Sequence, residues 1–152
     1  ESWEDKYYWH EDAVPFKTVI ANHWEPVYAY RAAPIVEDGV YKIDGEEFDF
    51  RAGSYTGYNA WREHLSFMAT GLNPRTIWNN SDRYATVPFF ELIHFSDCEG
   101  IIGSAVSRKL AADFARFQEK ADQHRDSWFR EKYDAWHKAF ELAADGGMVA
   151  FH

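Results

Sequence analysis

Apolar residues recur with the 3.6-residue period of a helix over residues 56–70. The stripe consists of Tyr58, Trp61, Leu65 and Met68. Ser54 or Thr56 can cap its start, because their side-chain oxygens accept hydrogen bonds from the free amides of a first turn. Gly71 can end it, since glycine readily adopts the left-handed conformation that closes helices. The pattern predicts a helix over about 56–70.

Two later segments show the same helical period. One is capped by Ser104, and its stripe consists of Val106, Leu110, Phe114 and Phe117. The other opens at Asp126 or Ser127 and is closed by Gly146. Its stripe consists of Phe129, Tyr133, Trp136, Phe140 and Ala143. Both segments are predicted to be helices whose aromatic faces pack into a core.

A β-hairpin is predicted around Asp44-Gly45. This dipeptide separates an apolar run at 40–43 from Phe48 and Phe50. Asp-Gly between apolar runs is typical of a hairpin, because both central residues of its tight turn need a positive φ.

The remaining segments have weaker patterns. Residues 87–96, "VPFFELIHFS", form a dense apolar run that predicts a buried strand, and 148–152 predict a short last strand. Residues 72–87 have the composition of a loop, and 97–103, "DCEGIIG", that of a turn.

These elements give the order ββαβααβ in one domain that covers residues 1–152. We expect an α+β or mixed α/β fold: a small mixed sheet with an N-terminal hairpin, packed by about three helices. Residues 1–15 are polar and aromatic without a clean period, and we expect an arm that packs on the body or on a partner.

Charge and composition exclude several classes of protein. The net charge of −9 argues against a nucleic-acid binder and against a polybasic membrane-surface protein, because both need clustered Lys and Arg. The single cysteine, Cys98, excludes an intrachain disulfide and fits a cytoplasmic setting. No apolar run is long enough to span a bilayer. Aromatic residues make up 18% of the chain, which favours an adhesive surface and a homodimer or another protein partner.

The first cluster of candidate functional residues lies where the strand-like run meets the first helix. The members taken as ligand-binding are Arg51, Ser54, Tyr55 and Arg62. An Arg beside a helix N-terminus can hold a carboxylate or a phosphate. The competing interpretation is that Ser54 only caps the helix and Arg51 pairs with an acidic neighbour.

The second cluster lies in "LIHFSDCEGIIGS". Asp97 and Glu99 are the candidate catalytic pair, since two carboxylates can serve as acid and base or bind a hard cation, and His94 is a further ligand-binding candidate. Turn chemistry is the competing interpretation, because Asp and Gly dominate turns. Cys98 is a poor candidate nucleophile, because adjacent carboxylates oppose formation of a thiolate.

The sequence contains none of several motifs that bind metals or nucleotide cofactors. The chain has no HExxH, no cysteine pair, no GxGxxG, no Gly-Lys-Ser/Thr loop and no Gly-x-Ser-x-Gly elbow. We therefore expect neither a metal nor another cofactor.

Three segments carry a resemblance: "FDFRAGSYTGYNAWR", "FSDCEGIIGSAVSRKLAADF" and "YDAWHKAFELAADGGMVAF". They resemble a group of small uncharacterised bacterial and phage-associated proteins, and the likeness leaves out the first 40 residues. The group implies a bacterial or phage-associated, cytoplasmic setting. It implies no activity and no catalytic residue.

Three functions fit the sequence. The first is a binding module for a small anionic ligand or a protein partner, centred on the 51–62 and 94–100 junctions. The second is a hydrolase-like enzyme that uses Asp97 and Glu99, and the third is a purely structural subunit. The first two require the two junctions to lie next to each other, which they would if both preceding strands were parallel in one sheet.

Overall fold

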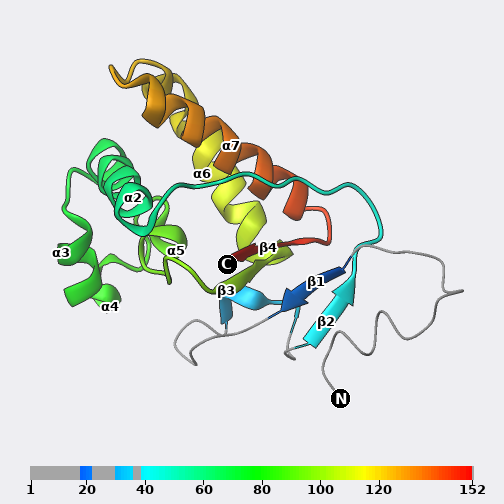
Figure 1. Ribbon diagram of the computed structural model, residues 1–152. Helices are drawn as coiled ribbons and strands as arrows, with labels where there is room; N and C mark the ends of the chain where they lie inside the picture. The colour runs from blue at the N-terminus through cyan, green and yellow to red at the C-terminus, as the bar shows by residue number, and fades with distance from the viewer. Residues whose placement is uncertain (1–17, 22–29, 36–38, 152) are drawn as a thin grey trace, which may run out of the picture.

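The computed structural model describes residues 18–21, 30–35 and 39–151 (Figure 1). The predicted arm at 1–15 lies outside these residues. The described chain has an α+β fold, with helices packed beside two small antiparallel sheets. No helix in the described ranges combines the length and hydropathy that crossing a membrane requires.

The three predicted helices are present. They are α2 (Tyr55–Thr70), α6 (Ser104–Asp122) and α7 (Ser127–Ala143). Three short helices accompany them, namely α3 (Pro74–Asn79), α4 (Ser81–Tyr84) and α5 (Phe90–Ile93). Helices α6 and α7 form a hairpin, and α2 packs beside it (Figure 1).

The ends of the helices confirm some predicted caps and correct others. The Ser54 hydroxyl accepts from the Gly57 amide at 3.1 Å, and Gly71 closes α2 at φ 73°. Ser104 does not cap α6: it is the first helical residue, because strand β3 runs directly into the helix and leaves Gly103 at the cap position. Helix α7 begins after Asp126 as expected.

Each sheet has two antiparallel strands. β1 (Thr18–Ala21) pairs with β2 (Gly39–Lys42), and β3 (Gly100–Gly103) pairs with β4 (Met148–Phe151). The predicted last strand is therefore confirmed. The predicted hairpin around Asp44-Gly45 is wrong, because β2 takes its partner from residues 18–21. Residues 43–53 instead belong to no helix or strand, and we call this segment, which runs from β2 toward α2, the strap (Figure 1).

Three other local predictions are wrong. The apolar run at 87–96 contains helix α5 and no strand. The predicted turn at 97–103 contains strand β3, and the predicted loop at 72–87 contains α3 and α4. Short apolar runs that are buried on all sides carry no period, so a helix and a strand look alike in sequence.

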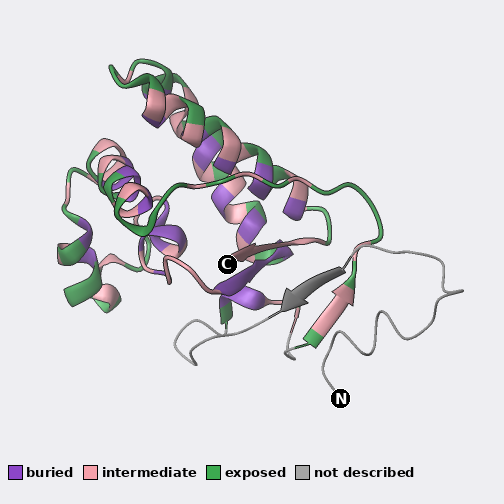
Figure 2. Ribbon diagram, viewed as in Figure 1, coloured by how far each residue is buried: buried purple, intermediate pink, exposed green. Residues whose placement is uncertain are grey.

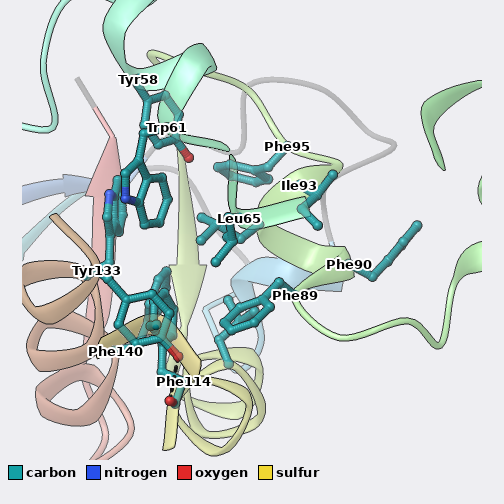
Figure 3. Packing of buried hydrophobic residues seen from close by; sticks show 14 of the residues in the cluster. Tyr58, Trp61, Leu65, Phe89, Phe90, Ile93, Phe95, Phe114, Tyr133 and Phe140 are labelled. Carbon is teal, nitrogen blue, oxygen red and sulfur yellow. Dashed lines mark hydrogen bonds between the residues drawn. The ribbon is translucent and has the colours of Figure 1, made fainter. Parts of the chain in front are cut away.

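The core lies between α2, α5, α6 and α7 and is rich in rings (Figures 2 and 3). The Trp61 indole donates to the Phe129 carbonyl at 3.2 Å, and the Tyr133 hydroxyl donates to the Phe114 carbonyl at 2.6 Å. These bonds satisfy the polar atoms of two buried aromatic side chains, as burial requires. The strap crosses α7 on its way from β2 to α2 and leaves much of its surface in solvent (Figures 1 and 2).

Candidate functional site

A groove of about 1400 Å³ runs between the strap, the C-terminal end of α7 and strand β4. We call it the strap groove. Three contacts hold the strap on α7. The Phe50 ring meets the edge of the Trp136 ring at 4.9 Å between centroids, the Lys138 ammonium lies 4.2 Å from the Phe48 centroid, and Lys132 donates to the Arg51 carbonyl. The groove is therefore bounded by a segment that these contacts hold against α7.

Aromatic rings line the groove. They are Tyr41, Phe48, Phe50, Tyr55, Tyr58, Trp136 and Phe151. Trp136 is central to this set, because its ring lies 5.4 Å from Tyr58 and 5.4 Å from Phe151, measured between centroids. A lining of this kind buries large apolar area on a ligand and presents ring faces to cations.

Two buried donors in this lining lack an acceptor among the described residues. The Tyr58 hydroxyl, whose neighbour Arg62 can only donate, and the Trp136 indole nitrogen donate no hydrogen bond to any described residue, although the side chains are only 2% and 4% exposed. Buried polar groups are nearly always paired, because an unpaired one loses its hydration without compensation. Both residues belong to the lining of the groove.

The Tyr58 hydroxyl stays protonated. Burial raises its pKa to about 12, and nearby Asp97 pushes the pKa the same way, while the charge of the Arg62 guanidinium and a hydrogen bond from it oppose both. The guanidinium lies 5.0 Å from the ring centroid. A protonated hydroxyl donates and accepts hydrogen bonds but does not act as a base.

The groove is strongly acidic. Its carboxylates are Asp44, Glu46, Glu47, Asp49, Asp97, Glu141 and Asp145. Its only basic lining residues in the described chain are Lys42 and Arg51. This balance disfavours the small anionic ligand that the Arg-rich helix start led us to expect, because like charges within a cleft repel.

The two predicted clusters, at 51–62 and 94–100, do lie next to each other, but a side-chain contact joins them and not a pair of parallel strands. The Asn59 amide in the second turn of α2 donates to the Asp97 carboxylate at 2.9 Å. The contact brings the "SDCEG" segment against the helix start without any parallel strands, since both sheets are antiparallel. Asp97 and Tyr58 both line the groove. We call the part of the groove formed by Asp97, Tyr58 and Trp136 its inner end.

Arg62 is buried within the structure and is not presented to a ligand. Its guanidinium donates to the Leu92 carbonyl at 3.3 Å, the Phe95 carbonyl at 2.7 Å and the Asn59 side-chain oxygen at 2.5 Å. The side chain is 3% exposed. Arg62 therefore links α2 to the segment after α5 and orients Asn59 toward Asp97.

The other candidates of the first cluster have separate positions. Ser54 serves as the helix cap, which is the competing interpretation. Arg51 is exposed, and its backbone carbonyl accepts from Lys132. Tyr55 is 64% exposed and lines the groove, so it is the candidate of this cluster best placed to touch a ligand.

His94 lies outside the groove lining and pairs with a buried arginine that sequence reasoning missed. The Arg31 guanidinium contacts the His94 Nδ1 atom at 2.8 Å and lies within 6 Å of the rings of Phe90 and Phe95. Burial, and then the Arg31 charge, lower the pKa of His94. A neutral His94 accepting from Arg31 fits this arrangement.

The proposed catalytic pair has the geometry of a turn. Ser96 Oγ accepts from the amides of Cys98 at 3.3 Å and Glu99 at 3.1 Å, which is ordinary turn chemistry. Burial pushes the pKa of Asp97 upward, but hydrogen bonds from Asn59 and Cys98 outweigh it and hold the pKa below its usual value. An ionised Asp97 is a poor general acid.

Cys98 lies in the same turn as Asp97 and Glu99. Burial raises the pKa of Cys98, which disfavours the thiolate. No group of three or more His, Cys, Asp or Glu residues in the described ranges is arranged to hold a metal ion.

Sequence reasoning missed the residues that line most of the groove. Trp136 was assigned to the core from its helical period, and the strap carboxylates were assigned to a hairpin. The alternation of Phe48 and Phe50 with Glu47 and Asp49 was the available signal, since it indicates an extended segment with one acidic and one aromatic face.

Comparison of the chain with protein-family models, with curated proteins and with solved structures gave no match. The resemblance described above stays a prediction, and the case for a function rests on the groove.

Proposed function

We propose that this protein is a binding module whose strap groove receives an extended segment of a protein partner. The observation that carries this proposal is the pair of buried donors, on Tyr58 and Trp136, that have no acceptor in the described part of the chain and lie in the lining of an aromatic groove. A carbonyl of a bound chain would accept from these donors and relieve the cost of burying them unpaired. The cytoplasmic setting is part of the same proposal.

The size and shape of the groove favour a chain segment over a small molecule. Its volume of about 1400 Å³ exceeds the roughly 300–1000 Å³ of most small-molecule pockets. One wall is the strap, whose residues belong to no helix or strand. The other wall includes strand β4. A peptide that binds as an added strand pairs with the exposed edge of a sheet, and strand β4 is the part of this groove that could serve as such an edge.

Selection from a random peptide display library on the immobilised full chain tests this proposal. Enriched peptides should bind the unmodified protein and bind Tyr55→Ala several-fold more weakly, because Tyr55 is an exposed ring on the groove. Phe67→Ala is the matched control, since Phe67 is another exposed ring of α2 and lies outside the groove lining. Enriched peptides that ignore Tyr55→Ala, or no enrichment at all, would contradict the proposal.

A further inference from the structure

We propose that the segment bound in the strap groove is basic, carrying lysine or arginine side chains on an extended backbone. This inference rests on the proposed function and names the chemistry of its ligand. Both walls of the groove are acidic: Asp44, Glu46 and Asp49 lie on the strap, and Glu141 and Asp145 lie at the end of α7. A cation between these walls meets negative charge on two sides, whereas an anion meets repulsion on both.

Two lysines of α7 already contact the strap with their ammonium groups. Lys138 places its ammonium 4.2 Å from the centroid of Phe48, and Lys132 donates to the carbonyl of Arg51. The strap thus binds cations from α7 by a cation–π contact and by a carbonyl acceptor. An incoming lysine or arginine would use the same two kinds of contact, with the exposed ring of Tyr55 as a further face.

The inner end of the groove and the part along the strap would bind different chemical groups of one ligand. At the inner end, Tyr58 and Trp136 offer donors that need an acceptor. Along the strap, the carboxylates need a cation. A basic peptide supplies both, because backbone carbonyls accept from the donors while its side chains reach the carboxylates. A simple alkylamine supplies only the cation.

The direct test titrates the ¹⁵N-labelled full chain with three probes. These are a short peptide of alternating lysine and valine, the same peptide with glutamate for lysine, and free cadaverine as a simple diamine. The readout is the Trp136 indole N–H resonance, assigned through its loss in Trp136→Phe. We expect the lysine peptide to shift this resonance, to bind at least tenfold more tightly than either other probe, and to weaken as salt is raised.

Charge variants locate the interaction on the strap. The combined variant Asp44→Asn, Glu46→Gln, Asp49→Asn should weaken binding of the lysine peptide about tenfold, as the loss of three exposed charge contacts implies. These three side chains are exposed, so the fold should tolerate the change.

A matched control removes the same charge elsewhere. Glu63→Gln, Glu119→Gln and Glu131→Gln together also remove three negative charges from a net charge of −9, at exposed helical positions outside the groove lining. Binding should change less than about twofold, because these exposed charges lie outside the groove lining and are screened by salt. Equal losses in the two combined variants would overturn a specific basic site in favour of general attraction to an acidic protein.

The outcomes separate this inference from the proposed function. Binding of the glutamate peptide as tight as that of the lysine peptide, with the Trp136 resonance shifted, would overturn the basic ligand and leave the groove as a peptide site. Cadaverine binding as tightly as the lysine peptide would overturn the extended chain. No shift of the Trp136 resonance with any probe, together with no enriched peptide in the display selection, would contradict both proposals.

Discussion

Arg62 fixes the inner end of the groove by joining parts of the chain that are far apart in sequence. Its guanidinium donates to two backbone carbonyls, at Leu92 and Phe95, and to the side chain of Asn59. The Asn59 amide then holds Asp97. One buried side chain therefore sets where the second cluster lies relative to α2.

We predict that Arg62→Leu lowers the free energy of unfolding by about 2–4 kcal/mol, because two buried carbonyls lose their donor. Urea unfolding followed by circular dichroism measures the change. Arg75→Leu is the control, since Arg75 is exposed on α3, and it should change the free energy of unfolding by less than about 0.5 kcal/mol. Equal effects of the two variants would show that Arg62 has no such linking role.

The pKa of His94 sets a pH dependence of stability. Its folded-state pKa lies below the ordinary value of 6.5, because of burial and the Arg31 charge. The unfolded chain therefore binds a proton more readily than the folded one, so stability is complete above the unfolded pKa and is lost as pH falls through the folded pKa. We expect urea unfolding to require less denaturant at pH 5.5 than at pH 7.

The variant His94→Gln isolates this contribution. Glutamine does not titrate, so the difference in stability between the two pH values should shrink. His124, whose pKa is also lowered by burial and by His64, would account for part of the remaining difference. An unchanged pH dependence in His94→Gln would contradict the assignment to His94.

Residue roles were predictable from sequence where the cause is local. The Ser54 cap and the Gly71 closure depend on one turn of chain, and both were read correctly. Arg62 was read as a ligand-binding residue because its acceptors lie about thirty residues away and are backbone atoms, which no side-chain pattern reveals. Arg31 was missed for the same reason: its environment comes from residues 90–95.

At the level of elements, the long helices followed from their periods and the short elements did not. Strand β2 pairs with β1 and not with the residues that follow Asp44-Gly45, although this dipeptide has the composition of a hairpin turn. Long-range pairing overrode a local signal there. The groove exists because of this outcome, since a strap paired into a hairpin would not extend across α7.

The junction of β3 with α6 depends on a close backbone approach. A methyl group on Gly103 would lie 2.3 Å from the carbonyl oxygens of both Ala32 and Ala33, and backbone atoms cannot easily move aside. We predict that Gly103→Ala lowers the free energy of unfolding by about 1–3 kcal/mol, through overpacking. Thermal or urea unfolding measures this loss.

Gly57→Ala provides the contrast for that measurement. A methyl group there approaches only the Ser54 hydroxyl, at 3.2 Å, and Gly57 lies inside α2, where alanine is favoured over glycine by roughly 1 kcal/mol. This variant should be neutral or stabilising. A Gly103→Ala protein as stable as Gly57→Ala would contradict the close approach of β3 to the 30–33 turn.

For the whole molecule, charge and rings are distributed unevenly. The acidic character that the net charge of −9 indicates is concentrated on the walls of the groove, and several of the chain's aromatic residues line it. Other exposed rings, such as Tyr30, Phe67 and Trp78, lie on separate elements. A homodimer stays a prediction, and sedimentation of the free protein over a range of concentrations measures it.

The most direct test of the central claim, that the groove keeps unpaired donors for a ligand, is one variant with two readouts. Tyr58→Phe removes a buried hydroxyl without changing the ring. The free protein should gain up to about 1 kcal/mol of stability, because an unpaired buried group is removed, and binding of the lysine peptide should weaken severalfold, because a donor to it is lost. Lower stability with unchanged peptide affinity would show that the hydroxyl serves the fold, and would contradict the account.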